Sequence, residues 1–138
     1  MREILLGATK RHTSNEILHL FYTPDWPRSR VATLAELVDS AALNGDAVAM
    51  GILQRAAHEL AILGASVRSQ LWEPGDEVFV AYIGGVFRSP LVLEHFRQRM
   101  ELDEGTRCVP PRYGPAIGAL LEAYRAAQLP ISDIRCGG

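Results

Sequence analysis

Residues 78–90 read Val-Phe-Val-Ala-Tyr-Ile-Gly-Gly-Val-Phe-Arg-Ser-Pro, and this stretch decides the fold. Its first six residues are continuously apolar and rich in β-branched and aromatic side chains, which is typical of a strand buried on both faces of a parallel sheet. Gly84-Gly85 ends the strand. Ser89-Pro90 opens a helix, because serine caps a helix N-terminus and proline fits its first turn. The stretch therefore predicts a strand, a glycine turn and a helix.

The segments after this stretch complete a small α/β unit. The helix that starts at Pro90 is expected to reach about residue 102, and residues 107–109 form a short second strand that Pro110-Pro111 confines to a sheet edge. A last helix is expected over 116–127. The fold class is therefore α/β, mostly helical, with a short parallel sheet.

The segments before the stretch are predicted to be helical. A capping box at Thr13 starts a helix over 13–22, and a second helix runs over 31–43. Asp46 is a good N-cap for the longest helix, over 47–72. That helix carries two apolar faces. The larger stripe recurs every three or four residues, and a second face of smaller residues lets another backbone approach closely: Val48, Ile52, Ala56, Leu60, Leu63, Val67 and Leu71 form the stripe, and Leu53, Ala57, Ala61 and Gly64 the second face.

Length and composition limit the class of protein. With 138 residues, 48% hydrophobic and 22% charged, the chain is expected to fold as one domain over 1–130, followed by a frayed tail over 131–138. A net charge of −2 argues against a nucleic-acid-binding surface. Membrane spans and a secretory signal are not expected. Cys108 and Cys136 fit no metal-ligand spacing, which favours a reduced, cytoplasmic setting.

Three segments together resemble a known family. They are residues 52–60 (Ile-Leu-Gln-Arg-Ala-Ala-His-Glu-Leu), 80–89 (Val-Ala-Tyr-Ile-Gly-Gly-Val-Phe-Arg-Ser) and 114–123 (Gly-Pro-Ala-Ile-Gly-Ala-Leu-Leu-Glu-Ala). Their order and spacing resemble the C-terminal lobe of the N-acetylglucosamine kinase-like, BadF/BadG-type ATPase family, within the actin, Hsp70 and sugar-kinase superfamily. The resemblance covers roughly residues 14–129. It implies a partial ribonuclease H-like lobe.

The same resemblance implies a site for ATP. Gly84 and Gly85 look like the family's adenosine motif, in which the backbone lies against the nucleoside. Val86, Phe87 and Ser89 would flank the nucleotide, with Ser89 mainly capping the following helix. A glycine at this place lacks the Cβ that would obstruct a ribose or a base.

Other parts of the family's machinery have no counterpart in this sequence. The family's N-terminal lobe opens with an Asp-Gly-Gly-Gly-Thr-type loop that holds the phosphates and Mg²⁺, and no such loop stands in the sequence. The catalytic carboxylate and the sugar pocket also belong to earlier segments of the family. Because phosphoryl transfer depends on such loops and on the metal, the chain alone is not expected to be a competent kinase. The sequence leaves open whether it is an enzyme.

Two alternatives remain at this stage. Activators of 2-hydroxyacyl-CoA dehydratases share the lobe and carry an iron–sulfur cluster, but their Gly-Gly-Val-Ala-Lys-Asn pattern departs from 84–89 here, and the sugar-kinase side is favoured. A non-catalytic binding or oligomerisation module would keep only the shape of the lobe. Because two short strands make a marginal sheet, the chain is expected to self-associate as a two-fold dimer or to pair with a missing N-terminal lobe.

Overall fold

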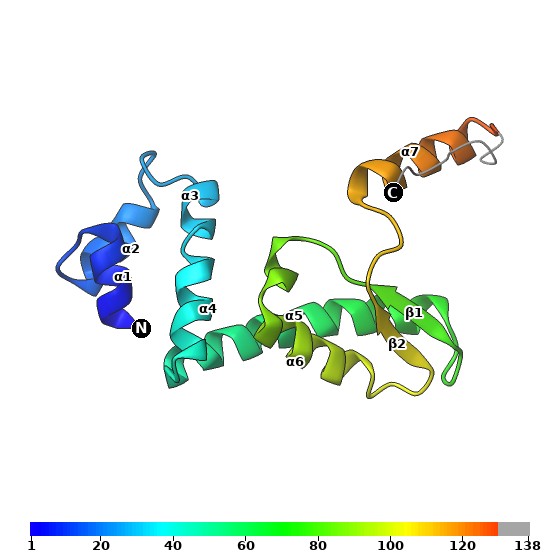
Figure 1. Ribbon diagram of the computed structural model, residues 1–138, viewed down its shortest axis with the longest axis horizontal. Helices are drawn as coiled ribbons and strands as arrows, with labels where there is room; N and C mark the ends of the chain where they lie inside the picture. The colour runs from blue at the N-terminus through cyan, green and yellow to red at the C-terminus, as the bar shows by residue number, and fades with distance from the viewer. Residues whose placement is uncertain (130–138) are drawn as a thin grey trace.

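A computed structural model describes residues 1–129, and the tail that the sequence predicts to fray lies outside them. The chain follows a simple order of elements: α1 (Arg2–Thr9), α2 (Ser14–Phe21), α3 (Arg28–Ala32), α4 (Ala35–Leu43), α5 (Ala47–Leu71), β1 (Val78–Ala81), the 3₁₀-helix η1 (Gly85–Arg88), α6 (Pro90–Met100), β2 (Thr106–Val109) and α7 (Pro115–Ala126). The prediction of a mostly helical α/β lobe with a short parallel sheet is confirmed. The first helices and the sheet lie at opposite ends of the molecule, and α5 lies between them (Figure 1).

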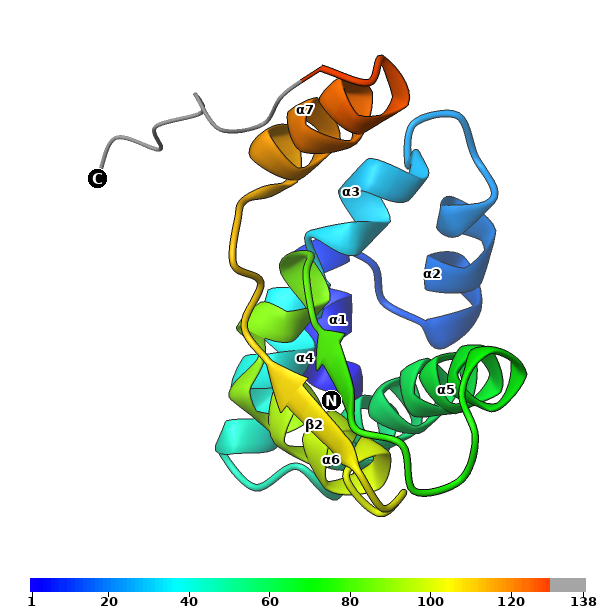
Figure 2. The same ribbon diagram turned by 90° about the vertical axis from the view of Figure 1, so that its right-hand side faces the viewer.

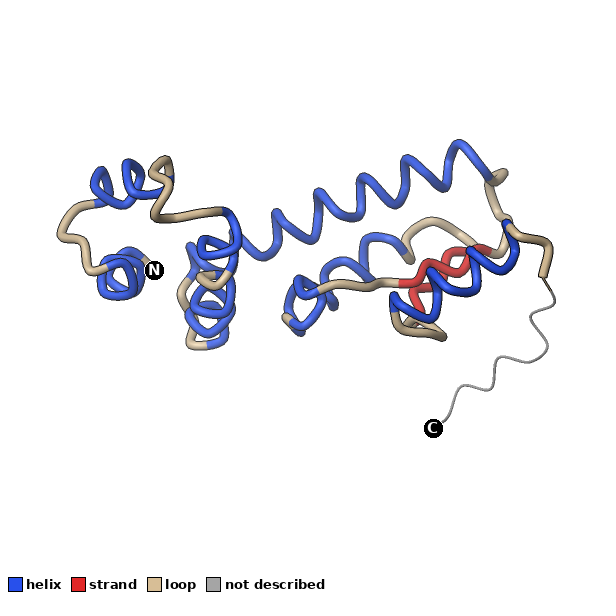
Figure 3. Tube along the Cα trace, turned by 90° about the horizontal axis from the view of Figure 1, so that it is seen from above, coloured by secondary structure: helices blue, strands red, loops and turns tan. Residues whose placement is uncertain are grey.

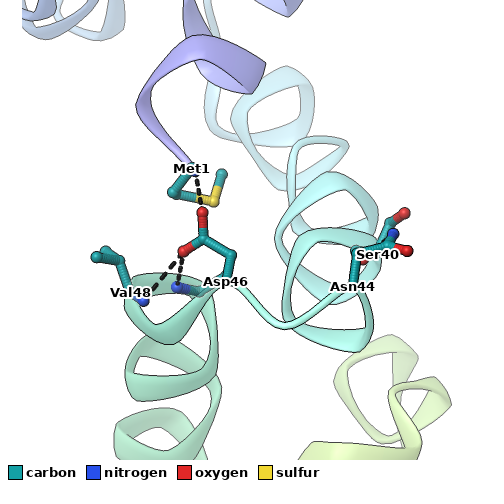
Figure 4. A network of polar contacts seen from close by, with 6 residues as sticks. Met1, Ser40, Asn44, Asp46 and Val48 are labelled. Carbon is teal, nitrogen blue, oxygen red and sulfur yellow. Dashed lines mark hydrogen bonds and ion pairs between the residues drawn. The ribbon is translucent and has the colours of Figure 1, made fainter.

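Helix α5 begins where the sequence predicts. The Asp46 carboxylate accepts hydrogen bonds from the backbone N–H groups of Val48 and Ala49, both at 3.0 Å, and also pairs with the α-amino group of Met1 (Figure 4). The Met1 amino group first, and then the N–H of Ala49, hold the pKa of Asp46 below its ordinary value. The cap thus brings α1 onto the start of α5.

The buried face of α5 is the one with small side chains. Ala49 and Ala57 have no exposed surface, and Leu53, Ala61 and Arg68 are also buried. The larger stripe is largely exposed, and Leu63 and Leu71 expose about two thirds of their surface, 64% and 65%. The reason is the short distance between helices: α4 and α6 approach α5 over alanines and glycine. A Cβ at Gly64 would lie 2.9 Å from the Sδ atom of Met100 on α6.

The sheet has two parallel strands joined through α6. Val78 pairs with Thr106 and Val80 with Cys108, and these four residues face the helices. The neighbouring pair, Phe79 and Arg107, faces outward, and Phe79 exposes 60% of its surface. The prediction that this strand is buried on both faces is therefore wrong, because helices cover only one side. Figure 2 shows β2 in front of α6, and in Figure 3 the long helix α5 runs past the two strands.

The amino ends of the two strands are held at one point by Arg68. This arginine, 7% exposed, donates from Nε to the Thr106 hydroxyl at 2.7 Å, and from Nη2 to the carbonyl oxygens of Glu104 at 2.9 Å and Asp76 at 3.2 Å. Gly105 lies beside it with φ +83°, and a Cβ there would overlap the carbonyl of Asp76. Only glycine fits this conformation and this contact.

The sequence predicts the helices at the amino-terminal end of the chain with mixed success. Helix α2 begins as expected, with the Thr13 hydroxyl accepting from Glu16 N–H at 3.2 Å. The helix predicted over 31–43 is wrong in its extent, because the chain turns at Thr33-Leu34 and forms α3 and α4. Leu34 packs there with Trp26 in a separate cluster.

Helices α1 and α7 lie at the two ends of the described chain. The sequence gives no expectation of α1. Helix α7 forms one residue earlier than predicted, buries none of its residues and lies apart from the sheet (Figure 1).

Candidate nucleotide site at the carboxyl end of β1

The glycine pair after β1 forms an open turn. Gly84 has φ +115° and ψ 164°, a backbone conformation that only glycine adopts without strain. Gly85 begins η1, and a Cβ added to it would meet no atom within 4 Å. The turn therefore exposes bare backbone to open space at the strand's carboxyl end, where parallel sheets bind their ligands.

A cavity of about 510 Å³ lies beside this turn. It is bounded by the turn on one side, by α3 and α4 on the other, and by α5 and α6 at its floor. Its lining residues are Ala32, Ala35, Glu36, Asp39, Leu53, Gly85, Val86, Arg88, Ser89 and Val92. The volume falls within the range of small-molecule sites, roughly 300–1,000 Å³.

Ser89 links the turn to both neighbouring helices. Its hydroxyl oxygen accepts a hydrogen bond from the N–H of Val92 at 3.2 Å, so it caps α6 as the sequence predicts. The same hydroxyl donates to the carboxylate of Asp39 on α4. Ser89 is thus a structural corner of the cavity.

The five residues expected at the site separate into two groups. Gly85, Val86 and Ser89 line the cavity, and Val86 is 45% exposed. Gly84 shapes the turn without lining the cavity. Phe87 points into the core, where its ring lies 5.0 Å from that of Phe96 and 5.6 Å from that of Tyr82, between centroids. Phe87 therefore anchors the turn to the core and does not line the cavity.

Charged groups on the cavity wall come mainly from α4, which sequence reasoning did not connect to the site. Glu36 and Asp39 stand three residues apart, so they share one face of the helix. The spacing predicts that the two side chains share a helix face. The sequence does not predict that α4 approaches a turn nearly 50 residues later. Arg88 brings a positive charge from the turn itself. In residues 1–129, no three His, Cys, Asp or Glu side chains gather as a metal site.

Comparison with known proteins assigns the family. The family model described as the BadF/BadG/BcrA/BcrD ATPase family matches residues 6–123. The chain belongs to this family. No curated protein matches the sequence. The BadF/BadG-type resemblance is therefore confirmed.

Membership in the BadF/BadG/BcrA/BcrD ATPase family implies ATP as the nucleotide. The match includes all of the predicted site, from Gly84 to Ser89, and the cavity wall on α4. None of the described helices is both long and apolar enough to span a membrane.

Proposed function

We propose that the chain is the adenine-nucleotide-binding, C-terminal portion of an N-acetylglucosamine kinase-like ATPase, working in the cytoplasm. The observation that carries this proposal is the cavity of about 510 Å³ at the end of β1. Gly85 lines this cavity with backbone alone, because glycine has no Cβ. ATP is the ligand class that the family implies. The nucleoside would lie against the backbone of Gly84-Gly85.

The lining of the cavity suits a nucleoside better than a phosphate chain. Val86, Ala32 and Ala35 offer exposed apolar surface for a base, above the buried side chains of Leu53 and Val92. The Glu36 carboxylate can only accept hydrogen bonds, which fits ribose hydroxyls or an adenine amino group and repels phosphate. The phosphates and Mg²⁺ would then extend toward loops of the other lobe, whose Asp-Gly-Gly-Gly-Thr-type sequence is not in this chain.

The binding test is calorimetric titration of ATP into the purified chain and into two variants. Gly85→Val puts a branched side chain where the nucleoside would lie, and it leaves the free fold intact because no atom lies within 4 Å of the new Cβ. Gly7→Val on α1 meets equally open space far from the cavity and is the matched control. We expect Gly85→Val to weaken ATP binding at least tenfold and Gly7→Val to leave it unchanged. Equal affinity in both variants contradicts the site.

The activity test concerns phosphoryl transfer. We expect the chain alone to phosphorylate neither glucosamine nor N-acetylglucosamine, because positioning of the γ-phosphate and metal requires groups that it lacks. A coupled ADP-release assay at high protein concentration measures this. Sugar phosphate formed above the level of a Gly85→Val preparation contradicts the expectation.

A second candidate function is assembly, and a specific observation favours it. Six large apolar side chains on α5 are exposed: Val48, Ile52, Ile62, Leu63, Val67 and Leu71. The outward face of the sheet adds Phe79. A surface of this kind favours self-association, most simply as a two-fold dimer. Light scattering at micromolar concentration tests it, and a 15.2 kDa monomer contradicts it.

A further inference from the structure

We infer that Asp39 is a positioning residue that holds the glycine turn at the distance from α4 that nucleotide binding requires. The inference rests on the proposed function for its ligand, and on the geometry of α4 and the turn for everything else. Asp39 lies on α4, 50 residues before Ser89, and accepts the hydrogen bond of the Ser89 hydroxyl.

This hydrogen bond bridges two walls of the cavity that rest on different helices. Helix α4 packs on α5, and η1 packs on α6. Within residues 1–129, the Asp39–Ser89 bond is the one hydrogen bond that connects α4 to the turn over 84–89. Both side chains are half-buried, where such a bond is less weakened by competing water. The cavity lies between these walls, so the bond fixes its width.

The Ser89 hydroxyl has no remaining freedom once both partners are in place. Its single proton goes to Asp39, and its oxygen accepts the N–H of Val92. Loss of the Asp39 acceptor would leave the α6 cap intact and release only the link to α4. The fold can therefore survive a change at Asp39 that alters the cavity.

Positioning of this kind matters for affinity because a preformed site avoids the cost of ordering its walls during binding. Val86 and Arg88 line the cavity from the segment that Ser89 anchors. When Ser89 is released, both side chains lose their fixed distance from Glu36 on the opposite wall. The expected result is weaker nucleotide binding with little change in stability.

The experiment compares Asp39→Ala, which removes the acceptor, with Asp39→Asn, which keeps an amide oxygen that can accept the same proton. Asp103→Ala removes an exposed carboxylate near the other end of α6 and is the control. Two quantities are measured on the full chain: ATP affinity, and the hydrogen exchange rate of backbone amides in 85–92. We expect Asp39→Ala to bind ATP about fivefold to tenfold more weakly and to exchange faster in 85–92. Asp39→Asn should stay within about twofold of the original chain in affinity.

The outcomes separate this inference from the proposed function. If the original chain binds no ATP, the proposed function fails, and the exchange rates still decide the role of Asp39. Unchanged exchange over 85–92 in Asp39→Ala overturns the inference, whatever the ATP affinity. Equal losses in Asp39→Ala and Asp39→Asn overturn it too, because the carboxylate charge would then be the active property. A loss of ATP affinity in Asp103→Ala equal to that in Asp39→Ala has the same consequence.

Discussion

The two ends of the β1–β2 sheet use glycine for opposite purposes. At the amino end, Gly105 has a positive φ, and the carbonyl of Asp76 leaves no room for a side chain there. At the carboxyl end, Gly84 also has a positive φ, yet neither Gly84 nor Gly85 has a neighbour within 4 Å of a hypothetical Cβ. One end is closed by packing, and the other is open beside a cavity.

The difference shows that a glycine's meaning depends on what surrounds it. Arg68 satisfies the carbonyl groups at the closed end, so changes there should act on the stability of the fold. At the open end, changes should act on ligand binding. Three measurements test this division, and a fourth tests a helix cap away from the sheet; they follow in order of decreasing expected effect.

The largest effect is expected for Gly105→Ala at the closed end. The new Cβ would overlap the backbone of Asp76 and would also require a positive φ, so we expect a loss of about 3 kcal/mol or more in the free energy of unfolding. Urea denaturation measures it. Gly75→Ala is the matched control, since Gly75 has φ +90° but open space around it and should lose only about 1 kcal/mol. Equal losses would show that contact with Asp76 is unimportant.

The next effect is expected for Arg68→Met, which keeps the apolar packing and removes every donor. The Thr106 hydroxyl would lose its partner in a buried place and two backbone carbonyls would lose theirs in partly buried places, at a cost of about 2–3 kcal/mol. Thermal and urea denaturation should agree on this loss. Arg55→Met on the exposed side of α5 should change stability by less than about 0.5 kcal/mol. A small loss at Arg68 would remove the contrast between the two ends.

A smaller effect separates the two glycines of the open end. Gly84→Ala forces alanine into a conformation that costs about 1–3 kcal/mol, whereas Gly85→Ala enters open space and should change the free energy of unfolding by about 0.5 kcal/mol at most. Denaturant titration of both variants measures the difference. If Gly85→Ala proves as destabilising as Gly84→Ala, the space around Gly85 is not open, and the contrast between the two ends of the sheet fails.

The smallest effect concerns pH and a site at neither end of the sheet. The pKa of Asp46 is lowered by the Met1 amino group and the Ala49 N–H, so its charged form stabilises the folded state at neutral pH. That contribution should be lost as pH falls from the ordinary carboxyl value of 3.8 through the lower folded value. Asp46→Asn still caps α5 without the charge. The stability difference between the two proteins should therefore shrink toward zero in acid, and a difference that grows as pH falls contradicts the assignment.

Local features of the fold could be predicted from the sequence, and distant contacts could not. Thr13, Asp46 and Ser89 cap helices as predicted because a cap depends on residues two or three positions away. The strand and glycine turn were also predicted. The small-residue face of α5 was also predicted to allow the close approach of another backbone, and it is the buried face. The exposure of the larger stripe could not be predicted, because both faces are apolar and α4 and α6 decide which one packs.

The candidate site shows the same limit. Gly85, Val86 and Ser89 could be named from the sequence, since they follow a strand in a family-like order. Asp39 and Glu36 could not, because α4 reaches the turn only through the fold. Arg68 also gave no signal, as an arginine in a long helix ordinarily faces water.

The alanine-lined face of α5 has a calorimetric consequence. The heat capacity change of unfolding reflects newly hydrated apolar surface, and it averages about 12–15 cal/mol/K per residue, or about 1.7–2.1 kcal/mol/K for a chain of 138 residues. Here Ala49, Ala57 and Ala61 are buried on α5 while Leu63 and Leu71 are already hydrated in the folded state. The heat capacity change on unfolding of the monomer should therefore fall below that range. The free energy of unfolding should then vary less steeply with temperature than is usual for a chain of this size.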